Sequence, residues 1–313
     1  MLYSAISEFP ILAIAALGFY ISLRFLCFPD LTVDASFMFG MSVVGLSLRQ
    51  GASSELSALF FAPILGAIVG MITGLLHTSK YLKMNKFLSG MLVAFASYSI
   101  CYRMCGQADI SLFQYRSQLI LFRIFEGTHI FVEPIVLSIL VFGIWLGIQR
   151  LMNSPFGLAL RTAGHRSEVL QVSGLNPKHF VILGLAFSNA IIAVAGWLNA
   201  TINRNVSLKN FGMIINVLAS CLIGDFLLHM LIGLFSKSAR SRKRSVFFLL
   251  LSPIVGAFAY SLIKSFVIKI LSGQLRITLT TDLQLIIALV IMLVAMAGKQ
   301  FNGFDQNDDE GGI

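Results

Sequence analysis

Apolar stretches of about 20 residues recur along almost the whole chain, and that length matches the hydrocarbon thickness of a lipid bilayer. Hydrophobic residues make up 57% of the sequence, whereas charged residues make up only 12%. A soluble domain carries about 25% charged residues to cover its surface, so most of this chain's surface must face lipid. The sequence therefore predicts an all-α polytopic membrane protein.

Nine membrane spans can be drawn from these apolar runs. They cover residues 9–24, 33–48, 56–76, 87–102, 130–149, 179–200, 211–234, 246–269 and 281–298. The first run has no basic segment before it and no small-residue cleavage site after it, so we expect a retained helix. We expect a broken or re-entrant segment near residues 28–36. The short, charged stretch 110–124 is expected to be interfacial or re-entrant.

The chain is organised as a single transmembrane domain over residues 1–300, followed by a tail over 301–313. The tail is acidic and has no apolar anchor, so it is expected to be disordered.

Basic residues gather in loops that nine spans would place on one side of the membrane. They are Lys80, Lys83 and Lys86, then Arg150, Arg161, Arg166 and Lys178, then Lys237, Arg240, Arg242, Lys243 and Arg244, and finally Lys299. The positive-inside rule puts that side in the cytoplasm, with the N-terminus outside and the C-terminus inside. The net charge of +9 is thus explained without a nucleic-acid partner.

A polar, basic loop over about residues 153–178 separates two long apolar spans. Ser154 and Pro155 resemble a helix start with proline at its first position. Gly164 would allow a turn, and a second short helix beginning near Glu168 would end at Gly174. Two short helices lying along the membrane surface would offer basic side chains to a protein partner.

The pattern of Gly157, Arg161, Thr162 and Gly164, with Gly174 ten residues later, resembles the cytoplasmic coupling loop of bacterial ABC-importer permeases. The similarity is greatest to the branched-chain amino acid/ribose type and its tryptophan/tyrosine-type subgroup. Further matching segments lie at residues 28–37, 74–78, 87–90, 183–190, 223–225 and 281–284. The resemblance thus covers about residues 9–298.

The chain departs from the pattern of its relatives at three places. Relatives usually carry Glu where Asp225 stands, and Gln and Asp in the outer segment where this chain has Thr201 to Asn205. The run 236–244 is also unusually basic. These differences bear on the solute more than on the fold.

The resemblance implies the membrane-spanning permease subunit of an ATP-driven importer that works by alternating access in a bacterial cell membrane. It also implies the partners: two ATP-binding cassette ATPase subunits, an extracytoplasmic solute-binding protein and a second permease copy. The cargo implied is a small solute, an amino acid by subgroup, with nucleosides or sugars as alternatives. ATPase coupling would fall to Gly157, Arg161, Gly164, Arg166, Glu168 and Gly174.

Polar side chains inside the spans need a reason, because a charge at a helix centre costs about 2.5–3.5 kcal/mol on insertion scales. Asp30, Thr32 and Asp34 stand at the start of the second span, either as helix caps or as part of the solute pathway. Ser188 and Asn189, on the sixth span, and Asp225, on the seventh, are further pathway candidates. Asp225 and His229 are one turn apart and can pair, as a structural or a gating contact.

The chain contains no G-x-x-x-x-G-K-[ST], H-E-x-x-H or G-x-S-x-G motif and no clustered metal ligands. A P-loop is therefore missing, and ATP hydrolysis is expected on a separate subunit. We expect no cofactor, no metal and no enzymatic activity. An ion-coupled secondary transporter or channel is the alternative function, and an intramembrane enzyme is the remaining, weaker one.

Overall fold

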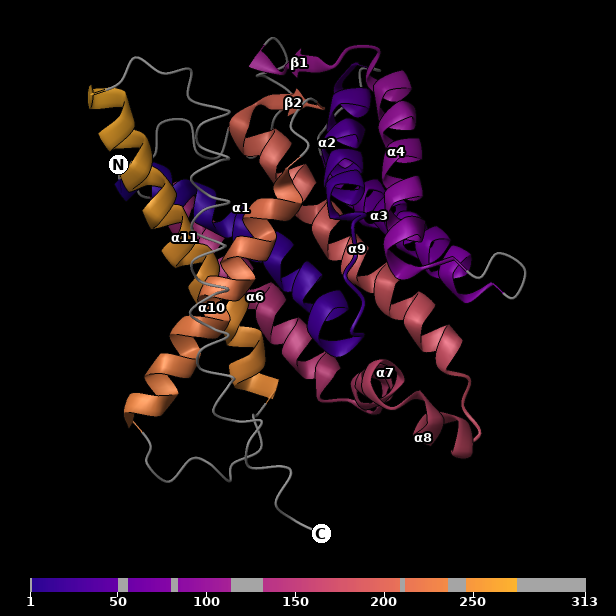
Figure 1. Cartoon of the computed structure of the whole chain (residues 1–313). Coiled ribbons are helices and arrows are strands. Elements are labelled where there is room, and N and C mark those ends of the chain that lie inside the picture. Colours follow the sequence, from indigo (N-terminus) through magenta and orange to yellow (C-terminus); the bar gives the residue numbers. More distant parts are fainter. Residues whose placement is uncertain are drawn as a thin grey trace. The chain divides into compact units, whose positions relative to one another are not determined.

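The computed structural model describes residues 2–49, 56–79, 84–113, 132–208, 212–235 and 246–274. Within these ranges the chain is helical apart from two three-residue strands (Figure 1). The elements are α1 (Leu2–Tyr20), the π-helix η1 (Ile21–Phe25), α2 (Val33–Arg49), α3 (Leu56–Thr78), α4 (Lys86–Cys105), β1 (Asp109–Ser111), α6 (Val132–Met152), α7 (Pro155–His165), α8 (Ser167–Val172), α9 (Pro177–Asn203), β2 (Asn205–Ser207), α10 (Met213–Phe235) and α11 (Val246–Gln274). Contacts divide the chain into two units, Pro10–Ile214 and the combination of Met1–Phe9 with Ile215–Ile313.

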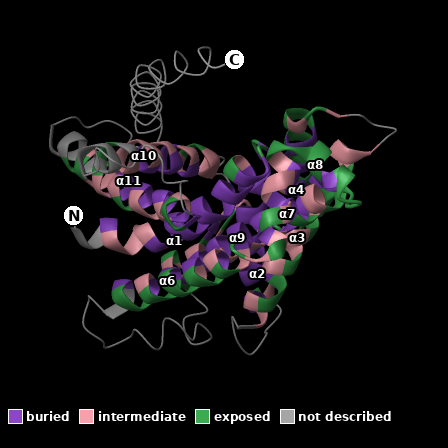
Figure 2. Ribbon diagram, turned by 90° about the horizontal axis from the view of Figure 1, so that it is seen from below, coloured by how far each residue is buried: buried purple, intermediate pink, exposed green. Residues whose placement is uncertain are grey.

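In the larger unit, Pro10–Ile214, α9 is the central helix and packs against α2 and α3. Glycines permit this close packing. A Cβ at Gly40 of α2 would lie 2.8 Å from the backbone nitrogen of Trp197, and one at Gly66 of α3 would lie 2.6 Å from the Cβ of Ala193. Small residues let helix backbones approach in just this way in membrane bundles. Figure 2 shows α9 and α2 largely buried, with exposed residues on the outer sides of α4 and α6.

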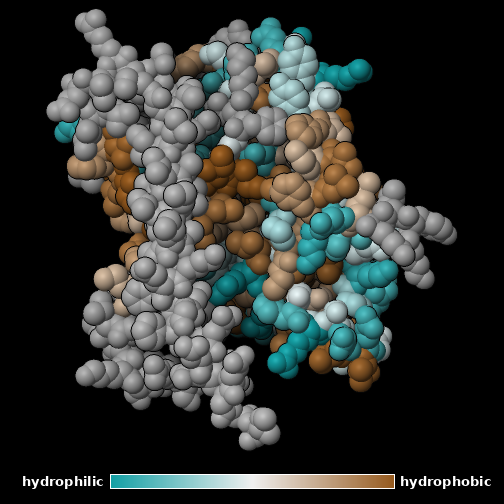
Figure 3. All heavy atoms as spheres, viewed as in Figure 1, coloured by the Kyte–Doolittle hydropathy of each residue, from teal (hydrophilic) through white to brown (hydrophobic). Residues whose placement is uncertain are grey.

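The two ends of α9 carry different structures. Before its first turn lie α7 and α8, and after its last turn lies β2, which pairs antiparallel with β1. Because α9 has 27 residues, its two ends are about 40 Å apart at 1.5 Å per residue. We call the pair of strands β1 and β2 the ribbon. In Figure 3, hydrophilic side chains gather around α7 and α8 and near the ribbon, and apolar side chains lie between these two regions.

In the smaller unit, α10 and α11 form an antiparallel pair in close contact. A Cβ at Gly224 would lie 2.7 Å from the carbonyl carbon of Ser252, and one at Gly256 would lie 2.7 Å from the backbone nitrogen of Gly224. Hydrogen bonds follow the same interface: Tyr260 donates to Asn216 Oδ1 at 2.7 Å, and Ser252 donates to Asp225 Oδ1 at 2.6 Å.

Six helices in the described residues are long and apolar enough to cross a membrane. They are Ala5–Phe25, Ser57–Thr78, Lys86–Cys105, Pro134–Met152, Pro177–Asn203 and Val246–Val267. Large apolar side chains project outward from α3, α4 and α6; examples are Phe60 (72% exposed), Phe95 (59%) and Ile139 (66%). Soluble proteins rarely expose apolar surface on this scale, whereas a bilayer covers it.

The all-helical membrane fold predicted from the sequence is therefore confirmed, but the count of nine spans is not. Helices occupy eight of the nine predicted ranges, and the ninth, 281–298, lies outside the described residues. Two of the eight are short: α2 has 17 residues, and the apolar stretch of α10 is Met213–Leu228. Both remain spans by prediction.

Three further expectations concern segments between and beyond the helices. The chain is non-helical from residue 26 to residue 32, so a helix break lies close to the predicted one; that it is re-entrant stays a prediction. In the segment 110–124, residues 110 and 111 belong to β1, and those from 114 on lie outside the described residues. The tail 301–313 lies outside them too, and the single-domain organisation stays a prediction.

Candidate functional site

The loop between α6 and α9 folds into the two short helices that its sequence predicts. Ser154 caps α7 by accepting a hydrogen bond from the Gly157 backbone, and Pro155 occupies the first turn. Gly174 has a φ of +78° and ends α8, and Asn176 then caps α9 by accepting from the Lys178 backbone at 3.1 Å. Each of these helix ends is therefore set by residues that lie close to it in the sequence.

The turn between these helices is not where the sequence suggested. Gly164 lies inside α7, and the chain turns at Arg166, whose φ and ψ are −143° and 68°. Gly164 is required for a different reason. A Cβ there would overlap the carbonyl group of Phe25 and lie 2.7 Å from the Cα of Leu26. The glycine lets α7 rest directly on the backbone of the helix break.

The Arg161 side chain binds backbone carbonyl groups near it in the sequence. Its Nε donates to the carbonyl of Gly157 at 3.2 Å, and its Nη2 donates to the carbonyl of Met152, the last residue of α6, at 3.1 Å. Partial burial lowers the pKa of the guanidinium, which stays charged because an arginine loses its proton only far above neutral pH. Arg161 therefore ties α7 to the end of α6.

The outward side of the loop combines charge with exposed apolar groups. Of the six residues expected to couple to an ATPase, Arg166, Glu168 and Gly174 are exposed, Gly157 is buried, and Arg161 and Gly164 are half-buried. The loop also exposes four apolar side chains that were not among the predicted coupling residues: Leu158 (60% exposed), Val169 (51%), Val172 (90%) and Leu175 (45%). We call these four the loop patch. The spacing of Val169 and Val172, one helical turn apart, was the available signal.

The break between η1 and α2 packs against α7. Leu26 and Phe28 donate backbone hydrogen bonds to Ile21 and Ser22 at 3.3 and 2.9 Å, and Cys27 adopts a left-handed φ of +50°. Lys86 Nζ donates to the Cys27 carbonyl at 2.9 Å. The Cys27 thiol is 3.6 Å from Nε2 of His165, at the end of α7.

Four polar side chains in and next to the break form a cluster with no exposed surface: Asp30, Thr32, Ser36 and Asn189. Asp30 accepts from the backbone N–H and the hydroxyl of Thr32, and from Nδ2 of Asn189 at 2.6 Å. Asn189 Oδ1 accepts from Ser36 at 2.6 Å and also lies 3.1 Å from the Thr32 hydroxyl. The second amide proton of Asn189 goes to the Leu185 carbonyl at 3.0 Å. We call these four residues the break cluster; its members satisfy one another.

The remaining pathway candidates also have protein partners. Asp34 accepts from the backbone N–H of Ile214 at 3.0 Å, so it caps the first turn of α10 and not its own helix. Ser188 donates to the Gly18 carbonyl at 2.7 Å and joins α9 to α1. Asp225, half-buried, accepts from Ser252. The side chain of His229 lies outside the described part of the chain, so its pairing with Asp225 stays a prediction.

A charged pair lies in the smaller unit. Lys264 of α11 donates to Glu8 of α1 at 2.6 Å, and the side chains are 22% and 46% exposed. The paired charges reduce the cost of placing either one in an apolar helix.

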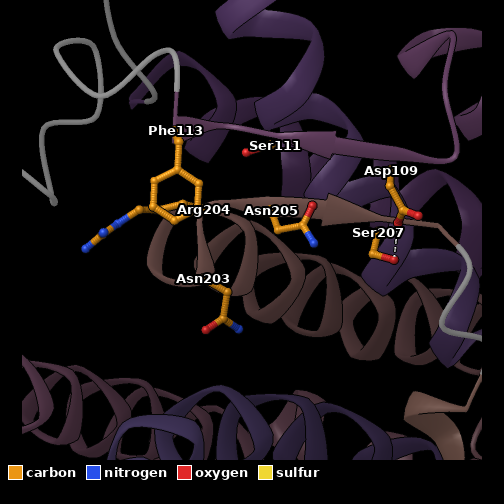
Figure 4. Close-up of a pocket in the computed structure, with 7 residues that line it drawn as sticks. All are labelled: Asp109, Ser111, Phe113, Asn203, Arg204, Asn205 and Ser207. Carbon is orange, nitrogen blue, oxygen red and sulfur yellow. Dashed lines mark hydrogen bonds between the residues drawn. The ribbon is translucent and has the colours of Figure 1, made fainter. Parts of the chain in front are cut away.

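The ribbon at the far end of α9 carries a polar hollow of about 690 Å³ (Figure 4). Asp109 pairs with Ser207 across the strands, and the Ser207 hydroxyl donates to the Asp109 carboxylate. Arg204, in a left-handed conformation with a φ of +53°, has its guanidinium 5.6 Å from the ring centre of Phe113. Among the described residues there is no group of three or more His, Cys, Asp or Glu side chains that could hold a metal ion.

Comparison with known proteins places this arrangement in a family. A family model described as "Branched-chain amino acid transport system / permease component" matches residues 1–296. The chain belongs to this permease family. It is therefore the multi-pass membrane component of an ABC transport system, a component that has no catalytic domain and works with ATPase partners.

Individual relatives agree with the family. The chain is 32% identical to a "Tyrosine transport system permease protein" of Clostridioides difficile over 298 residues, which is 95% of this permease and 90% of the relative. It is 28% identical to "Uncharacterized protein RP368" of Rickettsia prowazekii over 237 residues, or 72% and 76% of the two chains. No solved structure matches the chain at a significant level.

Proposed function

We propose that this permease imports an amino acid, with tyrosine as the first candidate, by alternating access driven by ATPase subunits that dock on α7 and α8. One observation carries the proposal. The pair α7–α8 exposes Arg166, Glu168 and the loop patch, while α7 rests on the break between η1 and α2. A partner that moves this pair would therefore push on the spans.

Charge and helix direction support an orientation with α7 and α8 in the cytoplasm and the N-terminus outside. Arg150, Arg166 and Lys178 lie on or beside α7 and α8, which fits the positive-inside rule. In the smaller unit, Lys264 lies about 27 Å along α11 from Val246 at 1.5 Å per residue, and Glu8 pairs with it there. The first turns of α1 thus lie away from Val246, the first residue of α11, which closely follows the basic run 236–244 in the sequence.

The ribbon supports an extracytoplasmic binding protein as the partner that delivers the solute. The ribbon lies at the opposite end of α9 from α7 and α8, and it offers an exposed carboxylate at Asp109, a guanidinium at Arg204 and a ring at Phe113 that is 61% exposed. Aromatic and arginine side chains are enriched at protein interfaces. A second permease copy completes the proposed importer, on the strength of family membership.

Burial separates the six residues expected to line the solute pathway. Asp225 is half-buried, whereas the other five (Asp30, Thr32, Asp34, Ser188 and Asn189) are buried. We therefore take Asp225 as the first candidate for contact with the solute. The tyrosine relative supports an amino acid as cargo, and the solute itself is left to the transport measurement.

Reconstitution tests the proposal directly. The permease is placed in liposomes with a candidate ATPase and a candidate binding protein, and uptake of labelled L-tyrosine is measured with and without ATP. We expect uptake only when ATP and the ATPase are both present. Uptake by the permease alone, driven by an imposed proton or sodium gradient, would instead favour the ion-coupled transporter and contradict the importer.

A further inference from the structure

The short break between η1 and α2 links the loop helices to the core of the larger unit. On its lower side, α7 touches it through Gly164 and His165, which lie against Phe25, Leu26 and Cys27. Leu26 also reaches α9: a Cβ at Gly184 would lie 2.7 Å from Leu26 Cδ1 and 2.6 Å from Leu160 Cδ1 of α7. A displacement of α7 would therefore act directly on residues 25–27 as well as on α9.

On its upper side, the break is joined to α2 and α9 by the break cluster. Asp30 belongs to the break, Ser36 to the first turn of α2, and Asn189 to the middle of α9. Asn189 bonds to both of the other two, at 2.6 Å in each case. It therefore connects three separate segments with one side chain.

The helices beyond the cluster are packed too closely to slide independently. Gly196 of α9 rests on Phe37 of α2, where an added Cβ would lie 2.9 Å from the Phe37 carbonyl carbon. Gly70 of α3 rests on Leu185 of α9, where an added Cβ would lie 2.6 Å from the Leu185 carbonyl carbon. A close-packed interior transmits strain instead of absorbing it.

We propose that Asp30 and Asn189 are positioning residues that convey movement of α7 into α2 and α9. This role rests on the proposed function, since it needs an ATPase that moves α7. Because every polar atom of the break cluster is buried, separating Asp30 from Asn189 would leave a carboxylate and an amide without partners in an apolar surrounding. The two residues therefore move together, and the break carries α2 and α9 with it. On this assignment the cluster does not contact the solute.

Exchange of the two side chains tests the assignment. Asp30→Asn and Asn189→Asp each place two like groups face to face, whereas the double variant restores a donor opposite an acceptor with the polarity reversed. Thr73→Val is the control, because it removes a buried side-chain hydrogen bond, from Thr73 to the Val69 carbonyl at 3.0 Å, in α3, which also packs on α9. Tyrosine uptake and ATP hydrolysis are measured in the same vesicles, together with the tyrosine concentration for half-maximal uptake.

We expect each single variant to lower uptake per ATP hydrolysed by about fivefold or more, the effect of losing one hydrogen bond worth about 1 kcal/mol. The half-maximal concentration should stay unchanged, and the double variant should recover most of the ratio. A shifted half-maximal concentration with a normal ratio would make the cluster a solute site and overturn the inference. Equal losses in Thr73→Val would show that the effect is a general loss of stability and would overturn the inference too.

A second measurement needs no solute. Asn205→Cys, at the ribbon end of α9, is introduced into a Cys27→Ser permease, and its rate of alkylation is compared before and after ATP and vanadate are added to the complex. The rate should change in that background and stay constant when Asp30→Asn is added. An equal change in both would contradict the inference while leaving the importer intact. If no ATPase binds the wild-type permease, the proposed function itself fails, and the inference fails with it.

Discussion

Gly164 of α7 lies so close to the carbonyl group of Phe25 that no larger residue fits between the loop helix and the helix break. The two residues are far apart in the sequence and belong to different segments, one in the loop proposed to bind the ATPase and one at the end of η1, which leads into α2. Their contact is backbone against backbone, so it offers no flexible side chain to absorb a push. It makes the loop and the break one mechanical unit.

Replacing Gly164 by alanine should therefore uncouple ATP hydrolysis from uptake. Excess volume in a packed site costs about 1–3 kcal/mol, and about 1.4 kcal/mol corresponds to a tenfold change. We expect tyrosine uptake to fall about tenfold while the permease still reaches the membrane and ATP hydrolysis continues. Gly147→Ala is the matched control, since an added Cβ there meets nothing within 4 Å. Equal effects of the two substitutions would argue against the contact.

Arg161→Ala should loosen α7 from the end of α6. Both of its hydrogen bonds go to backbone carbonyls of Gly157 and Met152, and a charged donor contributes about 1.5–3 kcal/mol when buried and less when half-exposed. We expect weaker retention of the ATPase during purification and a lower melting temperature. Arg161→Lys, which keeps the charge but lacks the forked donor, should fall between alanine and wild type. A melting temperature unchanged in Arg161→Ala would show that the tie is dispensable.

Val172→Asp should prevent the ATPase from docking without disturbing the permease. Val172 is 90% exposed, so the substitution breaks no internal packing, but it puts a charge in the loop patch. Co-purification of the ATPase measures the effect, with Val172→Leu as the control that keeps the surface apolar. We expect the leucine variant to bind normally and the aspartate variant to lose most of its ATPase. Normal binding by Val172→Asp would place the docking surface elsewhere.

The helices of this protein could be predicted from the sequence because lipid imposes length and composition on a span. The predicted range 56–76 became α3, Leu56–Thr78, and the predicted range 179–200 became α9, Pro177–Asn203. The start of α7 could be predicted equally well, because Ser154 and Pro155 act on neighbouring residues. Such signals are local.

What could not be predicted depends on partners distant in sequence. Asp30 was recognised as a cap or pathway residue, but nothing near it points to Asn189, which lies 159 positions away. Gly164 was interpreted as a turn residue because the sequence alone does not distinguish a glycine needed for close helix packing from one needed for its backbone freedom. Strands β1 and β2 have three residues each, too few to produce a visible alternation.

Exchanging Glu8 and Lys264 should show that these residues stabilise the smaller unit as a pair. Glu8→Lys puts two cations where the structure has an ion pair of 2.6 Å, and we expect less folded protein in the membrane. The double variant Glu8→Lys with Lys264→Glu should recover most of it, with a coupling energy of about 1 kcal/mol because both side chains are partly exposed. Fluorescence size-exclusion chromatography of detergent extracts measures the yield. If the double variant is as poor as the sum of its parts, the two charges act independently.

Cysteine labelling should place the two ends of α9 on opposite sides of the membrane. Cys27 is the one exposed cysteine of the four in the described residues. A Cys27→Ser permease should therefore react little with a maleimide until a new cysteine is introduced. Gln171→Cys on α8 and Asn205→Cys on the ribbon both sit at exposed positions, and each is treated with a maleimide that cannot cross the membrane. In intact spheroplasts Asn205→Cys should react at once, whereas Gln171→Cys should react only after the membrane is made permeable, because the positive-inside rule predicts that α7 and α8 lie in the cytoplasm. The reverse pattern would put the loop patch outside, beyond the reach of any cytoplasmic ATPase.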